Sequence, residues 1–538
     1  MKPRTRDAVP SEAQTSASGA DAERLASASW AVRLEGMLRS PWAVLVVVGT
    51  LMCVAALLAI HAIGDKSLWL DEGLSARLAQ FSPADAISAT YSTPTPGAIA
   101  LYYVLLHFWS SVSTDESWLR LLSAVCVVAS IPLVYMLGRR LMSTAAGVTA
   151  ATVVALSPYV VSQAQSARPY GLVILLATAL TLTFYSAMKV GGLRIWLLYA
   201  AVALAGVYAH TTVAYLIAAQ GAVAGVDLLL LRRRSIWTIG SRCAAAAVIV
   251  VGCYPLTGQF SAEGLAGVPS PTFQNVGQAP YHLTGGATLL LVTSFAVIAL
   301  PLIGWVWLRR GRQLEFSILV AVSVAPIALE LLVSLQRPMF IERYLTMAIP
   351  GLALLVAAAV DLLSSWKPSL RGAVATRSPR QSAIVTAGAW ALIAVLALRS
   401  VGSVYTGWQE QWRGAVEMVA AESQSGDQVI VYPGYARLPF DYYATRNPGF
   451  RNIRPAFPEI GWGDYFPASG PSFAASLADA KQTGRVWLVY RSGDGVGATD
   501  ASLIASFVSC GITRSDTTLE QVEVVLVEFP AAGCLAAR

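Results

Sequence analysis

The chain has 538 residues, of which 55% are hydrophobic and only 13% are charged, whereas about a quarter of the residues of an average soluble protein are charged. This composition excludes a soluble globular protein and predicts a polytopic membrane protein. The net charge of +7 would by itself suit a nucleic-acid-binding protein. The Lys and Arg residues instead fall in small clusters between apolar runs, the distribution that sets membrane orientation, so we expect no nucleic-acid partner.

The first 40 residues are rich in Ala, Ser, Thr and charged residues and contain no apolar core. This composition is typical of a disordered tail, and it is followed by a short amphipathic piece around residues 30–38. The pattern of a cleavable signal peptide is absent ahead of the first apolar run. We therefore expect residues 1–40 to form a cytoplasmic tail.

Eleven apolar segments approach the length of about 20 residues that a membrane-spanning helix needs. Arg33 and Arg39 precede the first segment, and each expected inner loop carries at least two Lys or Arg residues, so the first span should start in the cytoplasm. Because the number of spans is odd, the remainder of the chain should lie outside. The expected spans cover residues 42–63, 118–137, 145–161, 170–188, 195–208, 213–231, 244–256, 287–308, 316–335, 345–363 and 383–398.

Two segments between the spans have a different pattern. A loop punctuated by proline, residues 92–97, leads into residues 99–109, which are too short to span and rich in aromatic side chains. We expect 99–109 to form a helix that lies at the outer membrane interface. Residues 257–286 are rich in Gly, Pro and Gln, show no spanning pattern and predict a long outer loop.

Residues 401–538 read as ordinary globular material. An amphipathic helical start at 408–422 is followed by strand-like runs at 428–432, 486–490 and 522–529. The alternation of strands with helical stretches predicts a small extracytoplasmic α/β domain.

The six cysteines fall into two groups. Four lie in or beside apolar runs, where cysteine acts as a small hydrophobic residue. Cys510 and Cys534 lie in the polar terminal region, where a disulfide would be stable on the oxidising side of a membrane. Such a bridge would close a loop of about 25 residues and stabilise the domain by roughly 3 kcal/mol on the chain-entropy model. The alternative is two unpaired cysteines.

The first candidate for chemistry is the adjacent carboxylate pair Asp71 and Glu72, which follows the first span. Charged groups close to a membrane are costly to bury unpaired, and they are functional-site candidates. We interpret Asp71 as the catalytic base, while Glu72 either shares this work or orients Asp71. The alternative is that the pair only marks the watery end of one helix and caps the next.

Three further outer turns face the same side of the membrane as Asp71 on this topology, and such convergence is what a binding site needs. Their residue types suit the transfer of a sugar from a lipid phosphate, because a carboxylate can take the proton of the attacking hydroxyl while guanidinium groups hold the departing phosphate. The alternatives are arginines that anchor lipid headgroups, ordinary interfacial tyrosines and a histidine with a structural role. The candidate residues for donor phosphate or sugar are Gln165, Arg168, Tyr170, His210, Arg337, Arg343 and Tyr344.

The sequence contains only four histidines and no metal-ligand spacing, so we expect no built-in metal site. It leaves open whether a divalent cation assists the reaction.

Several short motifs follow one another along the chain in a fixed order. They are WLDE at 69–72, LYYVLLHFW at 101–109, LGRRL at 137–141, LSP at 156–158, QSARPY at 165–170, YAH at 208–210 and ERYL at 342–345. As a set they resemble the GT-C glycosyltransferases, and within them the bacterial branch related to protein O-mannosyltransferases and the lipid A aminoarabinose transferase (ArnT-like). The resemblance covers about residues 41–400. The high Ala, Val, Arg and Gly content suits an actinobacterial source.

The resemblance implies an inverting transferase that uses a polyprenyl-phosphate sugar, with Asp71 as the base. Arg168 and Tyr170 match the family's Ala-Arg-x-Tyr turn, and Arg343 and Tyr344 match its Arg-Tyr turn. Relatives often have His-Pro-Pro before the interfacial helix, whereas this chain has Thr-Pro-Thr-Pro at 93–96. This departure leaves the class of acceptor open.

The sequence therefore predicts a transmembrane GT-C domain over residues 41–400, which moves a hexose, with mannose favoured, from polyprenyl phosphate. The expected acceptor is a lipoglycan, glycolipid or protein at the outer face of the cytoplasmic membrane. Pentose donors of the arabinose type are the first alternative, because they serve similar folds. A lipid-linked sugar flippase would place charges at the membrane midplane, and these spans are almost free of charge. A glycan-binding scaffold without activity is the third alternative.

Overall fold

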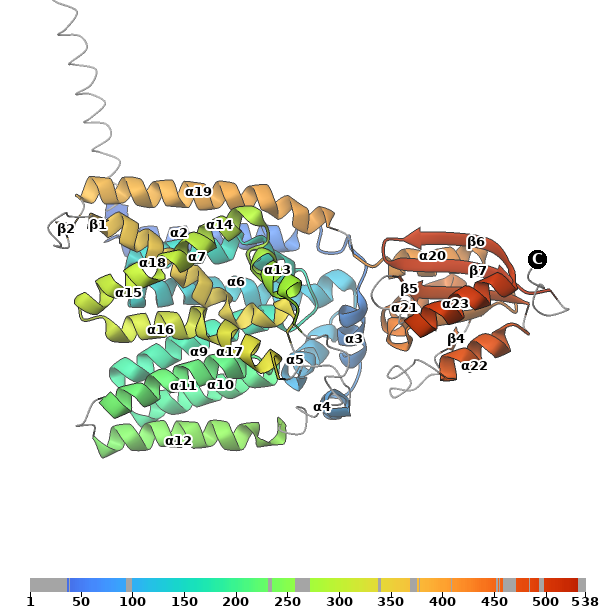
Figure 1. Ribbon diagram of the computed structural model, residues 1–538, viewed down its shortest axis with the longest axis horizontal. Coiled ribbons are helices and arrows are strands. Elements are labelled where there is room, and N and C mark those ends of the chain that lie inside the picture. Colours follow the sequence, from blue (N-terminus) through green and yellow to red (C-terminus); the bar gives the residue numbers. More distant parts are fainter. Residues whose placement is uncertain are drawn as a thin grey trace, which may run out of the picture.

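The computed structural model describes residues 36–37, 39–92, 99–230, 235–256, 271–336, 340–367, 375–376, 378–407, 409–450, 453, 455–457, 471–482, 484–492 and 498–530. An elongated helical bundle forms one part of the molecule, and a smaller part built on a β-sheet adjoins one end of the bundle (Figure 1). The predicted architecture, a mainly helical polytopic fold with a C-terminal α/β domain, is confirmed.

Among the described residues, seven helices are long and apolar enough to cross a membrane. Three further pairs of helices qualify together but are bent by 59°, 45° and 40°, and one shorter apolar helix, α10 (Leu193–Ala209), lies where a span was predicted. The straight helices are α2 (Pro41–Ile60), α6 (Glu116–Leu141), α9 (Tyr170–Val190), α11 (Val213–Leu230), α12 (Ile236–Cys253), α18 (Ile349–Ser365) with its preceding 3-10 turn, and α19 (Pro379–Thr406).

The three bends have a common cause. Each second helix has a proline in its first turn, namely Pro158, Pro301 and Pro326. Proline lacks a backbone N–H and disfavours helical geometry in the residue before it, so the chain breaks there and restarts. The pairs are α7 (Thr144–Leu156) with α8 (Pro158–Ala164), α14 (Ala287–Ile298) with α15 (Leu300–Arg309), and α16 (Gln313–Ser323) with α17 (Ala325–Ser334).

At the end of the bundle nearest the sheet lie three short helices (Figure 1). They are α3 (Leu70–Leu78), α4 (Pro83–Ser92) and α5 (Ala100–Ser110), and α5 corresponds to the helix predicted at 99–109. One prediction needs correction: the segment expected to be a loop without regular structure contains α13 (Phe273–Thr284), which packs against α8. The Gly, Pro and Gln residues of this segment favoured a loop in the sequence, but the helix forms with Pro280 in its interior.

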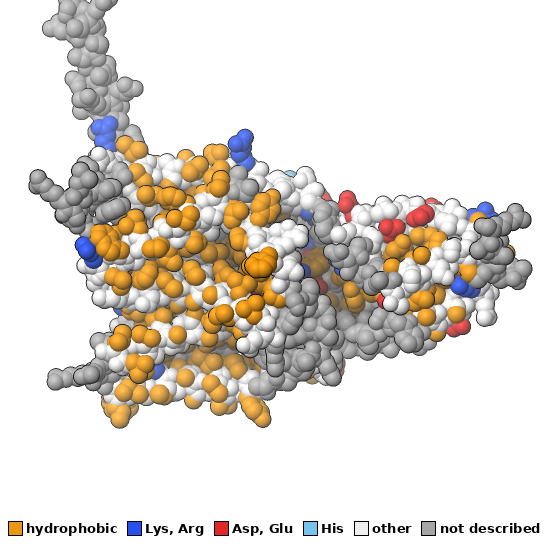
Figure 2. All heavy atoms as spheres, in the orientation of Figure 1, with side chains coloured by type: hydrophobic (Ala, Val, Ile, Leu, Met, Phe, Trp, Pro, Cys, Tyr) orange, Lys and Arg blue, Asp and Glu red, His pale blue; other side chains and the backbone are white. Residues whose placement is uncertain are grey.

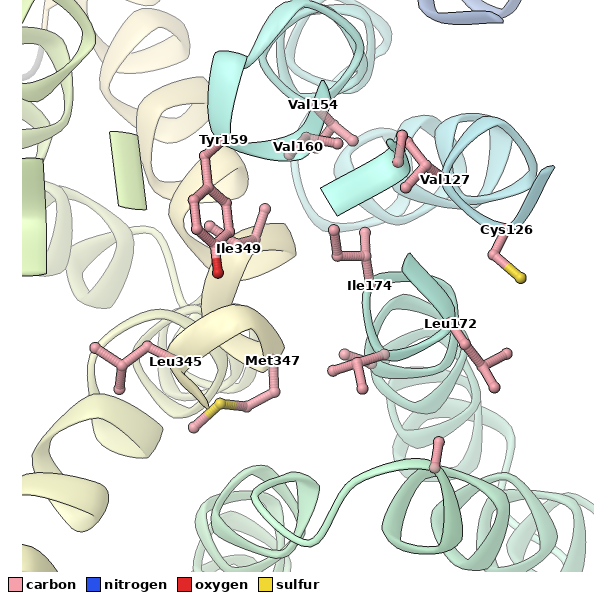
Figure 3. Packing of buried hydrophobic residues seen from close by; sticks show 14 of the residues in the cluster. Cys126, Val127, Val154, Tyr159, Val160, Leu172, Ile174, Leu345, Met347 and Ile349 are labelled. Carbon is pink, nitrogen blue, oxygen red and sulfur yellow. The ribbon is translucent and has the colours of Figure 1, made fainter. Parts of the chain in front are cut away.

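Buried hydrophobic side chains of α6, α7, α8, α9 and α18 interlock around the turn that precedes α18 (Figure 3). Tyr159 of α8 faces Ile349 of α18, and its hydroxyl lies 2.5 Å from that of Thr346 in the turn. The outward face of the bundle is also hydrophobic, whereas the acidic side chains visible in the same view lie on the sheet part and at its junction with the bundle (Figure 2). An apolar outer face of this size suits contact with lipid.

The C-terminal part is a five-stranded sheet with the order β4-β3-β5-β7-β6, in which β4, β3 and β5 are parallel and β7 and β6 are antiparallel. The predicted strands appear as β3 (Gln428–Tyr432), β5 (Arg485–Arg491) and β7 (Val522–Glu528). The edge strands β4 (Pro455–Phe457) and β6 (Ile512–Leu519) were not predicted. Central strands buried on both faces read as Val-rich runs, while β6 is largely polar.

Helices α20 (Trp412–Glu422), α21 (Arg437–Ala444), α22 (Pro471–Ala480) and α23 (Ala498–Cys510) accompany the sheet. Cys510 at the end of α23 is disulfide-bonded, and Cys534, the partner predicted for it, lies outside the described residues.

Candidate functional site

Asp71 lies in the first turn of α3, where a negative side chain is favoured by the helix dipole. One of its carboxylate oxygens, Oδ2, lies 3.3 Å from Nη2 of Arg168 and 3.3 Å from Nη2 of Arg343. Arg168 comes from the turn between α8 and α9, and Arg343 from the 3-10 turn η3 (Glu342–Ala348) ahead of α18. Three of the four predicted outer turns thus meet at one carboxylate.

The two arginines differ in their freedom. Arg168 is buried, and its Nη1 donates to the backbone oxygen of Asp71 at 3.2 Å and to the hydroxyl of Tyr103 at 3.1 Å. The side chain of Arg343 is 35% exposed, and its guanidinium lies 5.4 Å from the ring centroid of Trp69. Arg168 is therefore fixed in place, whereas Arg343 can turn toward a ligand.

The electrostatics of the site keep Asp71 ionised. Burial raises the pKa of the Asp71 carboxyl, but Arg168, Arg343 and Arg491 outweigh it and leave this pKa below its usual value. Burial and the same Arg168 and Arg343 lower the pKa of His210 to about 3. At neutral pH the site therefore holds a carboxylate, two guanidinium groups and a neutral imidazole.

Tyr170, His210 and Tyr344 form an aromatic cluster beside the arginines. The imidazole of His210 lies 5.6 Å from the ring of Tyr170 and 4.9 Å from that of Tyr344, measured between centroids. The Nδ1 atom of His210 pairs with the hydroxyl of Thr212 at 2.9 Å. The hydroxyl of Tyr170 and Nε2 of His210 are buried without a hydrogen-bond partner in the described structure. Buried polar atoms in this state are what an incoming ligand would satisfy.

A cavity of about 200 Å³ adjoins this cluster. It is lined by charged, amide and aromatic side chains, which include Lys66, Trp69, Glu72, Arg120, Gln163, Tyr170, Arg343 and Gln409. Tyr170 of the aromatic cluster and Arg343 of the ion pair with Asp71 are both among its lining residues. The site therefore offers room for a polar ligand at Arg343, which pairs with Asp71.

Glu72 is in a different environment from its neighbour. Its side chain is 1% exposed, and both oxygens receive hydrogen bonds from Arg120, at 2.8 and 2.7 Å. The backbone N–H of Ala167 and the amide of Gln409 donate to it as well, at 2.8 and 3.3 Å. Arg120 in turn donates to the carbonyl oxygens of Ile63, Lys66 and Ser67. Glu72 thus ties α3 to α6 and to the α8–α9 turn, and its lone pairs are occupied.

Gln165, another predicted residue, is among the lining residues of the cavity, but its amide is engaged by backbone groups. The side-chain amide of Gln165 donates to the carbonyl oxygens of Leu58, Ala59 and His61, and it thereby closes the C-terminal end of α2. Arg337 lies outside the described residues.

Sequence reasoning missed Arg120, Tyr103, Gln409 and Glu410. Arg120 had a signal, because it is a lone charge inside the apolar run predicted at 118–137. Tyr103 lies in the aromatic-rich segment but looked like one interfacial tyrosine among several. The contacts of Gln409 and Glu410 reach about 340 residues back along the chain and left no local pattern.

Within the described ranges, no three His, Cys, Asp or Glu side chains gather closely enough to hold a metal ion. The groups nearest to Asp71 are cations, which suits an anionic ligand.

Comparisons with known proteins bear on the family and the fold. Residues 96–257 match the family model described as dolichyl-phosphate-mannose-protein mannosyltransferase, and this segment includes Arg168, Tyr170 and His210. A comparison with the curated proteins gave no match.

Solved structures extend the likeness to the whole fold. The chain is similar to ArnT from Cupriavidus metallidurans in the apo state, at 14% identity and a TM-score of 0.52, over 90% of this chain and 98% of ArnT. Against the same protein bound to undecaprenyl phosphate the identity is 14% and the TM-score 0.50, over 89% and 97% of the two chains. The archaeal oligosaccharyltransferase AglB from Archaeoglobus fulgidus is also similar, at 14% identity and a TM-score of 0.48, over 82% and 69%. The resemblance found in the sequence is thus confirmed: this multi-pass membrane protein has the GT-C glycosyltransferase fold, in the form that ArnT displays.

Proposed function

We propose that this protein transfers a sugar from a polyprenyl phosphate to an acceptor hydroxyl. The observation that supports it most is a single carboxylate, Asp71, held 3.3 Å from two guanidinium groups beside a polar cavity. A carboxylate can accept a proton, and two guanidinium groups can hold a phosphate, so one cluster supplies both needs of the reaction.

In the proposed reaction the acceptor oxygen bonds to the anomeric carbon while the bond from that carbon to the phosphate oxygen breaks. The hydroxyl proton passes to Asp71, and the electron pair of the broken bond stays on the phosphate, which Arg168 and Arg343 hold. Attack from the face opposite the phosphate inverts the anomeric carbon. Tyr170 lines the cavity, and His210 and Tyr344 extend the aromatic cluster behind it.

The two arginines also couple donor binding to the basicity of the Asp71 carboxylate. Arg168 and Arg343 lower the pKa of Asp71 in the empty site, which makes its carboxylate a weak base. When a donor phosphate engages the same guanidinium groups, it partly neutralises them, and the pKa of Asp71 rises. Asp71 thus becomes a better base only when the donor is present.

The site should face outward from the cytoplasmic membrane, with the N-terminus inside. Basic residues gather at the end of the bundle away from the sheet: Lys189 pairs with Glu315 at 2.7 Å, Arg140 donates to Ser186, and Arg312 donates to the carbonyl of Leu141. A basic end is the cytoplasmic end in most membrane proteins. The opposite end carries α3 and the sheet, which is where lipid-linked sugars and envelope acceptors would be met.

Mannose is the proposed sugar, because the matched family model describes mannosyltransferases and the sequence motifs point to the same branch. The proposed acceptor is a lipoglycan, glycolipid or protein of the cell envelope. Transfer of an arabinose-type pentose is the second candidate, which the similarity in fold to ArnT favours.

The direct test is transfer of radiolabelled sugar in membranes that contain the full chain, with polyprenyl-phosphate mannose and polyprenyl-phosphate arabinose offered in parallel. Label in an envelope glycolipid or protein from the first donor alone supports a mannosyltransferase. Label from the second donor alone supports a pentosyltransferase. Transfer from neither donor contradicts the proposal.

We expect Arg343→Ala to weaken binding of undecaprenyl phosphate. A hydrogen bond to a charged group contributes about 1.5–3 kcal/mol, which corresponds to roughly a 10-fold to 100-fold increase in Kd. The Kd of undecaprenyl phosphate for the purified protein in nanodiscs is the quantity to measure. Arg514→Ala is the matched control, because Arg514 pairs with Glu528 on the exposed edge of the sheet. Equal Kd values for the two variants would assign the phosphate to other residues.

A further inference from the structure

The helix that carries Asp71 begins without a cap of its own. Its N-cap residue, Trp69, makes no side-chain hydrogen bond to the first turn. Instead the backbone N–H of Leu70 donates to Oε2 of Glu410 at 3.0 Å. The first N–H groups of a helix have no partner within the helix, and a carboxylate placed there also complements the helix dipole. Glu410, which lies about 340 residues away in the chain, therefore caps α3.

Glu410 is in turn held by the C-terminal part of the protein. It is 3% exposed, its Oε2 receives a hydrogen bond from the indole of Trp412 at 2.8 Å, and its Oε1 lies 2.8 Å from Nε of Arg491. Trp412 is the first residue of α20, and Arg491 is the last residue of β5, a central strand of the sheet. The cap of α3 is thus anchored in the sheet.

Other contacts fasten the same helix and the residues just before it to the C-terminal part. The backbone N–H of Leu68 donates to the hydroxyl of Tyr443 at 2.6 Å, and Gln409 donates to the carbonyl of Ser67 at 2.6 Å. At Gly73 the backbones approach so closely that a Cβ atom would lie 2.5 Å from the nitrogen of Pro439 in α21. Helix α3 is therefore held between the bundle and α21 without room to shift.

The C-terminal part also contributes charge to the site. Arg491 is one of the three cations that lower the pKa of Asp71, and Tyr435 lies near enough for Asp71 to raise the pKa of its hydroxyl, in addition to the larger effect of burial. The charged and titratable groups that face Asp71 are Tyr103 of α5, Arg168 of the α8–α9 turn, Arg343 and Tyr344 of η3, Tyr435 of the 3-10 turn after β3, and Arg491 of β5.

We infer that the C-terminal domain is a working part of the active site, in which Glu410 and Arg491 are positioning residues that set the orientation and charge of Asp71. The inference rests on the proposed function of Asp71 as the base. It means that the sheet is not a separate binding module: Arg491 of β5 holds Glu410, which caps the helix that carries Asp71.

The first experiment needs no substrate. Hydrogen–deuterium exchange of the full chain in nanodiscs is compared for wild type, Glu410→Ala and Glu410→Gln. We expect amide exchange over 70–78 to quicken about 10-fold in Glu410→Ala, as a lost cap frees the first helical turn. Glu410→Gln keeps an oxygen that can accept from Leu70, so it should show a smaller change. Unchanged exchange in Glu410→Ala overturns the inference.

The second experiment reads the charge of Asp71 from the pH dependence of kcat/KM, whose acid limb reports the free enzyme's base. Arg491→Gln removes one of the cations that favour the carboxylate, so the acid limb should move to higher pH, and Arg491→Lys should restore it. Arg485→Gln is the matched control, since Arg485 lies at the other end of β5 and pairs with Asp427. A merely structural loss would lower activity in both variants without moving the limb.

The two experiments separate the two ideas. If wild type transfers no sugar, the proposed function fails, while the exchange result still decides whether Glu410 holds α3. If transfer occurs and the acid limb of the kcat/KM profile lies at the same pH in Arg491→Gln and in Arg485→Gln, the role of Arg491 is overturned. The proposed function then still stands.

Discussion

Asp71→Asn should abolish sugar transfer, lowering kcat/KM by about 10³-fold, because a positioned general base contributes about 10²–10⁴ and the amide cannot accept the proton. Binding of undecaprenyl phosphate should be kept or become tighter. The substitution removes a negative charge that lies 3.3 Å from each of the two guanidinium groups that the phosphate would use. Transfer of radiolabelled sugar and binding to the purified protein measure the two effects separately.

The matched control for this change is Asp65→Asn. Asp65 is exposed and lies in the loop that leads to the same helix, so it tests the loss of a carboxylate near the site without touching the arginines. An Asp71→Asn variant that keeps more than about a tenth of the wild-type rate would exclude Asp71 as the base. A variant that loses transfer and binding together would instead assign Asp71 a structural role.

Arg120→Ala should have the largest effect on stability. It leaves Glu72 as a buried charge without its counter-ion, and removing one partner of a buried ion pair costs about 3–5 kcal/mol. The backbone carbonyls of Ile63 and Lys66 lose their side-chain donor at the same time, and that of Ser67 keeps only Gln409. We expect a clear fall in the thermal unfolding midpoint of the full chain in nanodiscs, with loss of activity as a consequence.

The control comes from the same helix. Arg140 is exposed near the far end of α6 and makes a single side-chain hydrogen bond, to Ser186, so Arg140→Ala should leave the midpoint near that of wild type. Glu72→Gln should fall between the two variants, because an amide oxygen can still accept from Arg120. If Arg120→Ala and Arg140→Ala unfold at the same temperature, the pair does not anchor α3.

The sequence was most informative where physical alternatives are few. An apolar run of about 20 residues has little choice in a bilayer but to form a helix, so the spans could be placed from composition alone. The bends were also visible in principle, since Pro158, Pro301 and Pro326 mark them. The membrane topology expected from the basic loops then places the turns with Asp71, Arg168 and Arg343 on the same side of the membrane.

The different environments of the two adjacent carboxylates could not be predicted. Asp71 and Glu72 have the same chemistry, but successive residues of a helix point about 100° apart, so Asp71 faces Arg168 and Arg343 while Glu72 faces Arg120. Which carboxylate meets which arginine depends on how α3 is rotated, and that rotation is set by contacts with Gln409, Glu410 and α21. These contacts arise only when the two ends of the chain dock.

The arrangement of one carboxylate between two guanidinium groups has a consequence for the charge balance of turnover. At rest the trio of Asp71, Arg168 and Arg343 carries one net positive charge, which a donor phosphodiester with its single negative charge cancels. Transfer leaves a phosphate that can carry a second negative charge, and the proton gained by Asp71 offsets it. The pocket therefore stays electrically neutral through the proposed reaction, which spares a poorly solvated site from any build-up of charge. The pocket regains its net positive charge when the polyprenyl phosphate product dissociates and Asp71 gives its proton to water. Product release would therefore also restore the charge that attracts the next donor.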